Sequence, residues 1–531
     1  MGMKEMPEIT TVKGGKIWTG TYENFKVKVY LPDTDLPVDI INFGFTAPYQ
    51  LIFEEKEMSL DEAIDFAETN GFAKIAKEHG SSVVFVYPTC DGGWEKAPYE
   101  LFVDLIAESK IHQYFKDGVV TMKNRFTGEI DGYAIRGAIF RTLVYGFGKS
   151  ADFIAKNYLK KVDGEYLWGP GEITPTLVSL ERLQVKPEIE RFDIPVISIG
   201  NSDEINEYLK KNCEQTLIKD KADYIEDYKA FSCRFKRWCG KLIIEDDFEK
   251  LGLVEEPSFE TVKTSPDNLG DYKDQPTHEV GYIAYYNKGL LDNGPVPTVF
   301  GFHGGGDSAM HLAYVSGWYE IAHKYNFLLI LVENHLNTTA TETIEFINKL
   351  KKKYPIDEKR IYASGFSMGG CKSWDLYQEY PEVFAGLAPM DATFEVGFNI
   401  YGKPAPKEIN KNVSVPIFYS GGEITPLPEL PFQAEKCWDR MRYVFEINKL
   451  KTKYDVKFED KENWADPIWG ISGDKIARVH DDECGSVLTL NYFESEDGVF
   501  RTVFTSVSGQ GHECRHHTCE QAWLFLSQFS K

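Results

Sequence analysis

Short apolar runs alternate with amphipathic segments along the second half of the chain. Residues 279–287 (EVGYIAYYN) alternate as a half-buried strand does, while 296–302 (VPTVFGF) and 327–332 (FLLILV) are continuous apolar runs typical of buried strands. A helix is expected at about 342–353, and the strand IYASGF leads through a sharp turn into a helix from Ser367 onward. Short strands separated by helices predict a parallel sheet with helices on both faces.

The first half of the chain shows the same kinds of element in the same order. FKVKVYLP (25–32), VDIINFGF (38–45) and SSVVFVYP (81–88) are predicted strands. TLVYGFGKSADFIAKNYL (142–159) repeats the strand, turn and helix of IYASGFSMGGCKSWDLYQEY (361–380). We interpret this recurrence as a duplication that places two domains of one kind in tandem.

The length of the chain agrees with two domains. Its 531 residues exceed one hydrophobic core, since single cores stop growing at roughly 250–300 residues. We expect domains over residues 1–240 and 241–531, each of the α/β class with a mostly parallel sheet. The polar stretch from about 205 to 277 has few strand signals and is interpreted as a helical connection followed by the first strand of the second domain.

The net negative charge of the chain argues against some classes of binding partner. The chain has 82 acidic and 59 basic residues, a formal net charge of -23, and a field of that sign repels nucleic acid and anionic membranes. The sequence has no run of about 18 apolar residues, so no transmembrane helix is expected. We expect neither nucleic acid nor membrane as a partner, while a homo-oligomer stays open.

Cysteine usage and the first residues bear on the compartment. Nine cysteines, an odd number scattered over both halves, argue against a disulfide framework and for a reducing compartment, although one or two pairs stay open. The start, MGMKEMPEITTVKGGKIW, lacks the apolar core of a signal peptide. We expect a cytoplasmic protein; a leader replaced by the Met-Gly-Met start would make it a secreted one.

The strongest chemical signal is Gly365-Phe366-Ser367-Met368-Gly369, between a predicted strand and a predicted helix. A serine nucleophile for acyl transfer projects from a tight strand-to-helix turn, where small residues two positions before and after it relieve crowding. The N-terminus of the following helix favours developing negative charge. Ser367 is therefore the candidate nucleophile; a glycine-rich turn with an incidental serine is the alternative.

A second glycine motif, His303-Gly304-Gly305-Gly306, directly follows the strand VPTVFGF. Glycines allow backbone N–H groups to face the carbonyl oxygen under attack. We expect Gly304 and Gly305, with the N–H of Met368, to form an oxyanion hole, in which one donor contributes about 3–4 kcal/mol. His303 is expected to organise the loop, and a bare glycine-rich turn is again the alternative.

The block YPIDEKRIYASGFSMGGCKSWDLYQEYPEVFAGLAPM (354–390) resembles the polyhydroxybutyrate depolymerase-like and feruloyl esterase branch of the α/β hydrolases. An I-D-x-x-R-[IV]-Y strand leads into G-x-S-x-G-G, and Y-P-x-x-F-A follows the next helix. The resemblance covers roughly residues 279–531. It implies a serine carboxylic-ester hydrolase that acts through an acyl-enzyme, without cofactor or metal, on a feruloyl, acetyl or other short acyl ester of a small molecule or carbohydrate. Hydroxyalkanoate depolymerisation is an alternative.

The family's general base is a histidine near the C-terminus, before a closing helix with a tryptophan. The resemblance assigns this role to His512, which follows Gly511, with Trp523 in the last helix. His516 and His517 have no matching motif position and are expected to be exposed residues at the start of that helix.

The same segment also reads H-E-x-x-H, as His512-Glu513-Cys514-Arg515-His516. A zinc hydrolase needs both imidazoles on one face of a buried helix, with the glutamate as base. The glycines before His512 and the short remaining chain argue against this alternative.

The third member of a Ser-His-acid triad is not fixed by the sequence. The family usually has an aspartate in a G-x-x-D loop after the strand that corresponds to VPIFYS (415–420), and this chain has Gly-Gly-Glu-Ile-Thr-Pro there. Glu423 is the nearest carboxylate and is our expected triad acid, because Asp and Glu both serve in this fold. Glu429 and Asp391 are its rivals.

The first domain lacks the matching catalytic residues. Gly148 stands where the nucleophile belongs, and Phe43-Gly44-Phe45 replaces the second glycine motif. Asp203 remains at the acid position, but without a nucleophile and a base it has nothing to orient. We therefore predict a catalytically degenerate α/β-hydrolase-like domain ahead of an active one.

Overall fold

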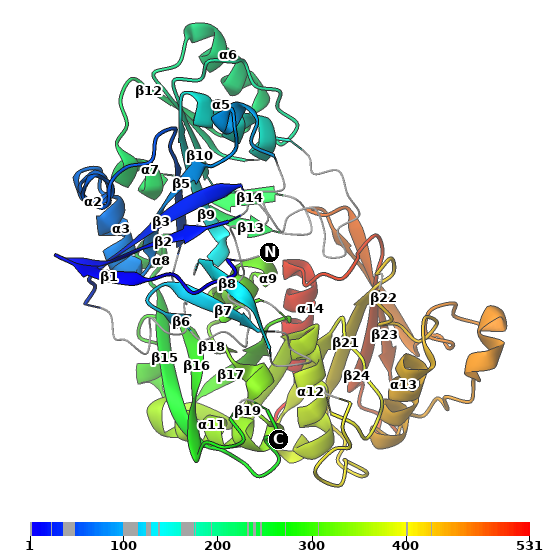
Figure 1. Cartoon of the computed structure of the whole chain (residues 1–531). Helices are drawn as coiled ribbons and strands as arrows, with labels where there is room; N and C mark the ends of the chain where they lie inside the picture. Colours follow the sequence, from blue (N-terminus) through cyan, green and yellow to red (C-terminus); the bar gives the residue numbers. More distant parts are fainter. Residues whose placement is uncertain are drawn as a thin grey trace. The chain divides into compact units, whose positions relative to one another are not determined.

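Two large mixed β-sheets, two smaller sheets and accompanying helices make up the described part of the computed structural model (Figure 1). The chain divides into two units, the first ending at Asp246 and the second running from Asp247 to Lys531. The fold is thus of the α/β class, as predicted. The structure describes residues 3–22, 24–35, 48–98, 115–123, 129–135, 138–160, 175, 177–192, 194–230, 233–236, 241–244, 247–270, 272–305, 307–399, 402–425 and 427–531.

The described sheet of the second unit has ten strands. Its centre is parallel, in the order β18-β17-β19-β20-β21-β24, and antiparallel strands extend it at both edges. The sheet is therefore mixed. Its strands are β15 (Leu253–Lys263), β16 (Thr277–Asn287), β17 (Val296–Phe302), β18 (Leu328–Val332), β19 (Ile356–Phe366), β20 (Gly386–Met390), β21 (Ile417–Gly422), β22 (Lys475–Asp481), β23 (Ser486–Phe493) and β24 (Thr502–Val507).

Helices of the second unit form two groups along its sheet. One group contains α9, α10 and α14, which contact one another, and in the other α11 contacts α12. The helices are α8 (Phe248–Leu251), α9 (Ala309–Ser316), α10 (Trp318–Tyr325), α11 (Ala340–Lys353), α12 (Met368–Glu379), α13 (Glu435–Ile447) and α14 (His516–Leu526), with short 3-10 turns η2 (Leu290–Asn293), η3 (His335–Asn337), η4 (Pro381–Val383) and η5 (Phe458–Asn463).

In the first unit, the described large sheet has nine strands, parallel from β5 to β12 and antiparallel at the other edge. These strands are β1 (Ile9–Val12), β2 (Gly15–Thr21), β3 (Phe25–Pro32), β4 (Pro48–Phe53), β5 (Ser82–Pro88), β9 (Ala138–Phe147), β10 (Leu177–Glu181), β11 (Val196–Ile199) and β12 (Thr216–Lys219). The remaining elements are β6 (Phe115–Lys116), β7 (Val119–Lys123), β8 (Ile130–Ile135), β13 (Cys233–Lys236), β14 (Lys241–Ile244), α2 (Leu60–Thr69), α3 (Phe72–His79), η1 (Gly93–Glu95), α5 (Lys149–Tyr158), α6 (Asp203–Asn212) and α7 (Tyr224–Ala230).

The two large sheets share an order of strands. The order β3-β5-β4-β9-β10-β11 in the first unit corresponds to β16-β18-β17-β19-β20-β21 in the second. The turns after β9 and β19 also share a backbone conformation: φ and ψ are 57° and -119° at Gly148, and 53° and -117° at Ser367. These likenesses agree with the repeat in the sequence.

Residues that follow the parallel strands of the second unit gather at one edge of its sheet, because the carboxyl ends of parallel strands lie together. Gly304 follows β17, Ser367 follows β19, Asp391 follows β20 and Glu423 follows β21. The strands themselves are held by burial: every residue of β18 and β20 is buried. The residues at this end of the sheet therefore follow strands that are fixed by burial.

Strand content between 205 and 277 is higher than the sequence predicts. The expected helical connection contains β12, β13 and β14 as well as helices. The strand β15 pairs with β16 over its full length, and most of its residues are half-buried. Charged residues on an edge strand protect it from further pairing, and they also hide its period-2 pattern. The predicted strand 38–45 lies outside the described residues.

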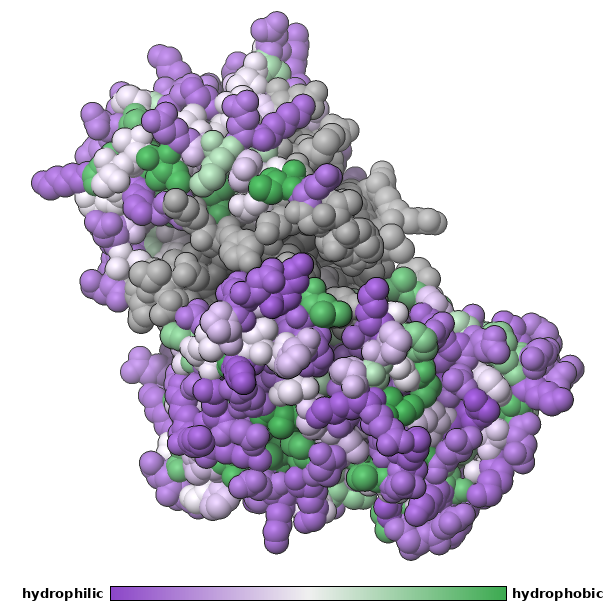
Figure 2. All heavy atoms as spheres, turned by 60° about the horizontal axis from the view of Figure 1, so that its bottom comes forward, coloured by the Kyte–Doolittle hydropathy of each residue, from purple (hydrophilic) through white to green (hydrophobic). Residues whose placement is uncertain are grey.

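Two further features bear on expectations from composition. Cys484 is disulfide-bonded, and six other cysteines of the described residues are free, in line with the one or two pairs that the sequence left open. None of the helices in the described ranges has the length and apolar character needed to cross a bilayer. Figure 2 shows a face on which hydrophilic side chains predominate and apolar residues form small groups.

Candidate active site

Ser367 lies at a strained turn between β19 and α12. Its positive φ is rare for a residue with a side chain and is typical of sites held in place by their surroundings. The flanking glycines allow the backbone to pack closely: a Cβ on Gly365 would clash with the carbonyl of Gly369, and one on Gly369 with the carbonyl of Phe302. The N–H of Ser367 donates to the carbonyl oxygen of Met390 at 3.0 Å. The motif therefore fixes the direction of the hydroxyl.

The structure brings His512 to Ser367 from the far end of the chain. The Nε2 atom of His512 lies 2.8 Å from the hydroxyl oxygen of Ser367, a distance suited to proton transfer. His512 lies in the loop between β24 and α14 and is 4% exposed. Its ring also packs against that of Phe366, with centroids 4.9 Å apart. The imidazole is thus held on both its polar and its apolar side.

A buried carboxylate contacts the other nitrogen of His512, and it belongs to Glu429. The Nδ1 atom of His512 forms a hydrogen bond with Oε1 of Glu429, which also accepts a hydrogen bond from the hydroxyl of Thr425 at 3.0 Å. Glu429 is 1% exposed, and burial raises its pKa to about 8. With Nδ1 donating to Glu429, Nε2 of His512 is free to accept a proton from Ser367.

This geometry corrects the expectation for Glu423. Its Oε1 atom accepts a hydrogen bond from the hydroxyl of Ser506 at 2.9 Å, on the neighbouring strand β24. Glu423 follows β21 directly, so its side chain stays at the sheet. Glu429 lies seven residues beyond the end of β21, and the intervening loop carries it to the imidazole. Its place between leucines in Leu427-Pro428-Glu429-Leu430 was a signal of burial that the sequence reasoning missed.

The glycine loop after β17 borders the nucleophile turn. Gly304 lies against the ring of Phe366, and a Cβ on Gly305 would come within 2.8 Å of the Met368 side chain. Gly306 lies outside the described residues. The amides of Gly304, Gly305 and Met368 thus belong to two adjoining segments, the second of which is the N-terminus of α12. Such a place favours negative charge on a bound oxygen.

The loop is held by buried histidines behind it. His303 uses Nδ1 toward the carbonyl of Gly304 at 2.7 Å and Nε2 toward the carbonyl of Glu333. His335 in η3 contacts the carbonyl of His303 at 2.9 Å. The Glu333 carboxylate accepts the N–H of Ala309 at 2.7 Å, and burial raises its pKa to about 7. His303 is therefore placed to shape the loop, as the sequence suggested.

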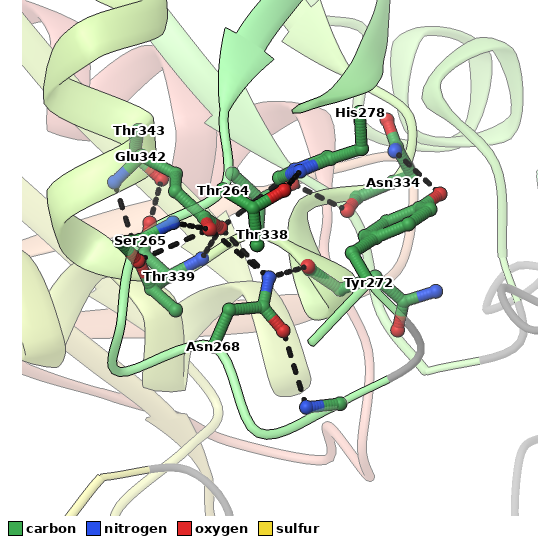
Figure 3. Close-up of polar contacts among 12 residues, drawn as sticks. Thr264, Ser265, Asn268, Tyr272, His278, Asn334, Thr338, Thr339, Glu342 and Thr343 are labelled. Carbon is green, nitrogen blue, oxygen red and sulfur yellow. Dashed lines mark hydrogen bonds and ion pairs between the residues drawn. The ribbon is translucent and has the colours of Figure 1, made fainter. Parts of the chain in front are cut away.

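A buried polar network anchors the segment that contains η3 (Figure 3). Glu342, in the first turn of α11, accepts hydrogen bonds from the N–H of Ser265 at 2.7 Å and from the Asn268 amide at 2.9 Å. The same Asn268 amide donates to the carbonyl of Asn337 at 3.0 Å. The carbonyl of Thr338 accepts a hydrogen bond from the buried Lys372 of α12. The network therefore ties α11 and α12 to the loop that supports the glycine motif.

His278 makes this network sensitive to acid. It stacks on Tyr272 with ring centroids 4.1 Å apart, and its Nε2 atom lies 3.7 Å from Glu342. Burial lowers the pKa of His278, with the Glu342 charge acting in the opposite direction. A base with a lowered pKa in the folded state contributes stability that is present above its unfolded pKa, about 6.5, and is lost as the pH falls below it.

We therefore expect the melting temperature of the wild type to fall more than that of His278→Gln between about pH 7 and pH 5. Glutamine can keep a hydrogen bond to Thr264 but does not titrate. Scanning calorimetry of both proteins over this range is the measurement. A constant difference between the two melting temperatures would show that His278 titrates in the folded protein as it does in the unfolded chain.

At the corresponding turn of the first unit, a backbone N–H group is hydrogen-bonded to an exposed carboxylate of the same unit. The N–H of Lys149, which follows Gly148, donates to Oε1 of Glu55 at 3.0 Å. This N–H corresponds in position to that of Met368 in the second unit. Gly148 supplies no hydroxyl. Asp203, the acid that remains in the sequence, lies at the start of α6.

The geometry does not favour the H-E-x-x-H alternative. The helix α14 begins at His516, so His512 lies in the preceding loop rather than on the same helical face. Within the described ranges, the structure contains no group of three or more His, Cys, Asp or Glu side chains arranged to hold a metal ion. His516 and His517 are half-buried rather than exposed as expected.

Comparisons with known proteins find distant likenesses. No family model matches the sequence. A bifunctional acetylxylan esterase/xylanase of Neocallimastix patriciarum is 25% identical over 163 residues, which are 29% of this chain and 22% of that protein. The match therefore spans less than a quarter of this curated relative.

Among solved structures, an acetyl xylan esterase from Aspergillus awamori is matched with a TM-score of 0.34 and 13% identity, over 51% of this chain and 99% of that one. The S-formylglutathione hydrolase of Staphylococcus aureus is matched with a TM-score of 0.26 and 15% identity, over 36% of this chain and 86% of that one. Scores at this level add nothing to what the site itself indicates.

Proposed function

We propose that the second unit is a serine carboxylic-ester hydrolase with Ser367 as nucleophile, His512 as general base and Glu429 as the acid of the triad. The proposal rests on one observation above all, the 2.8 Å contact between the Ser367 hydroxyl and Nε2 of His512 at a strained strand-to-helix turn. The resemblance of residues 354–390 to the α/β hydrolases and the acetylxylan esterase relative support it.

The reaction would proceed in two acyl transfers. His512 takes the proton of Ser367 as the serine oxygen bonds to the ester carbonyl carbon, and the carbonyl oxygen becomes negative near the N–H groups of Gly304, Gly305 and Met368. Collapse breaks the bond to the alcohol oxygen, which receives the proton from His512. Water then repeats the sequence on the acyl-enzyme, releasing the acid and restoring the serine.

The expected substrates are acetyl, feruloyl or other short acyl esters, and the likeness to an acetylxylan esterase/xylanase favours acetyl groups on a carbohydrate. A hydroxyalkanoate polyester is the second candidate, supported by the resemblance alone. We expect neither cofactor nor metal to take part, and neither nucleic acid nor membrane as a partner. The disulfide at Cys484 favours an oxidising compartment over the cytoplasm.

A serine-directed probe tests the reaction class. A fluorophosphonate is expected to label the wild type at Ser367 and to abolish hydrolysis of aryl acetate, acetylated xylan and feruloyl esters, while a metal chelator leaves the rates unchanged. Peptide mass spectrometry locates the label. Inhibition by the chelator without labelling by the phosphonate would favour the zinc alternative instead.

We further propose that the first unit is a degenerate copy without hydrolase activity. Gly148 replaces the nucleophile, and the Glu55 carboxylate accepts the N–H that an oxyanion would need. The shared strand order and turn geometry support the duplication.

A further inference from the structure

Asp391 is a second buried carboxyl beside the proposed triad. It follows β20 directly, is 1% exposed and has a φ of 50°, a conformation that aspartate and asparagine adopt more readily than most residues with a side chain. Its N–H donates to the carbonyl of Ser420 at 2.8 Å. A side chain held in this way belongs to the construction of the site rather than to the surface.

The contacts of Asp391 reach the segments that carry the triad. Its Oδ1 atom accepts the N–H of Gly422 at 3.1 Å, at the end of β21, and the side-chain amide of Gln510 at 3.2 Å. Gln510 lies two residues before His512, and its amide also donates to the carbonyl of Glu513 at 3.0 Å. The preceding residue, Met390, accepts the N–H of Ser367. Asp391 therefore joins the loops of the base and of the acid.

The side chain of Asp391 also lies within hydrogen-bonding reach of Glu429. The Oε1 atom of Glu429 contacts His512 and Thr425. Its Oε2 atom is buried, and no N–H or O–H group of the described residues donates to it unless a proton lies between the two carboxyls. Two ionised carboxylates at this separation would repel each other strongly in a buried place. One of them has to be protonated.

The surroundings decide which carboxyl carries the proton. Burial and the charge of Glu429 raise the pKa of Asp391 well above its ordinary value, while the charge of His512 acts in the opposite direction. Burial also raises the pKa of Glu429, to about 8, against the opposing effect of hydrogen bonds from Asp391 and Thr425. The single charge is better placed on Glu429, because its Oε1 atom faces Nδ1 of His512 and the Thr425 hydroxyl. Beyond Glu429 and His512, the ionisable groups around Asp391 include the buried thiol of Cys514. Asp391 is thus the neutral partner.

We propose that Asp391 is a positioning residue, a neutral carboxylic acid whose O–H donates to Oε2 of Glu429 and holds that carboxylate against His512. The site then contains a single negative charge, on the carboxylate that faces the imidazole. This inference rests on the proposed function for its kinetic consequences, but the protonated state can be observed without any turnover.

The first test detects the proton. Asp391→Asn keeps an N–H donor, and asparagine tolerates a positive φ. In the infrared difference spectrum between wild type and Asp391→Asn at neutral pH, the wild type is expected to show an additional C=O band of a protonated carboxyl, beyond any band from other buried acids such as Glu333. An acid with a raised pKa contributes stability that is lost as the pH rises above its unfolded value of about 3.9. The melting temperature of the wild type is therefore expected to fall relative to Asp391→Asn between about pH 4 and pH 7. A missing band together with a constant difference in melting temperature would overturn the proposal, whatever the activity.

The second test compares the pH–rate profiles of Asp391→Asn and Asp391→Gly with that of the wild type, to determine how Asp391 affects catalysis. Glycine accommodates the backbone without strain but provides no donor. We expect Asp391→Asn to stay within about threefold of the wild-type kcat/KM with an unmoved acid limb. In Asp391→Gly, the Glu429 anion loses a hydrogen bond, so the acid limb should move to higher pH and kcat/KM should fall about tenfold or more.

Other profiles would contradict the proposal. A shift of the acid limb to lower pH in Asp391→Asn would show that Asp391 is ionised and stabilises the imidazolium directly. A loss of activity in Asp391→Gly with an unmoved limb would show a purely structural role. If none of the proteins, wild type included, hydrolyses an ester while the infrared band behaves as expected, the proposed function fails and the carboxyl pair stands.

Discussion

Replacing Ser367 by alanine is expected to lower kcat/KM for a short-chain aryl ester by about 10⁴-fold or more, as in serine hydrolases that lose their nucleophile. The turn keeps its Cβ in this variant, so the backbone is no more strained than before, and the melting temperature should stay close to that of the wild type. Initial rates and calorimetry on the same preparation measure both effects.

The same variant also tests the first unit. Any hydrolysis that survives in full-length Ser367→Ala and resists the fluorophosphonate would have to arise elsewhere in the chain. Full activity of Ser367→Ala would remove the proposed function altogether, because the contact with His512 would then serve no chemistry.

Replacing Glu429 by glutamine is expected to lower kcat/KM by about 10³–10⁴-fold, since the amide no longer stabilises the imidazolium and can favour the wrong tautomer of His512. Glu423→Gln is the matched control. It lies in the same loop, six residues earlier, and its carboxylate faces Ser506. We expect Glu423→Gln to stay within about threefold of the wild type.

Steady-state kinetics of the two glutamine variants under the same conditions decide between the carboxylates. A larger loss of kcat/KM in Glu423→Gln than in Glu429→Gln would identify Glu423, the residue that the sequence favours, as the acid of the triad.

The parts of the site that the sequence predicted are those set by local chemistry. A strand, a glycine-flanked serine and a helix follow one another within a few residues, so a short segment of sequence determines their geometry. The position of Glu429 depends instead on a loop after β21 whose path is fixed by distant contacts, such as the Tyr419 hydroxyl on the Glu429 carbonyl. A motif that counts residues from the strand selects Glu423 and misses this loop.

The fold shows the same division. Buried strands such as β18 were predicted because each is a short apolar run between helices. The edge strand β15 was expected only as a first strand somewhere before residue 277, and its bounds were not predicted because pairing with β16, rather than its own pattern, makes it a strand. Long-range pairing overrides local preference in sheets more often than in helices.

The turns at Gly148 and Ser367 have the same backbone conformation but differ in its energetic cost. The conformation shared by Gly148 and Ser367 is free of strain for glycine but costs of order 1–3 kcal/mol for a residue with a side chain. A laboratory lineage screened for heat resistance alone should therefore drift from serine to glycine at position 367, and would arrive at the residue that position 148 already has.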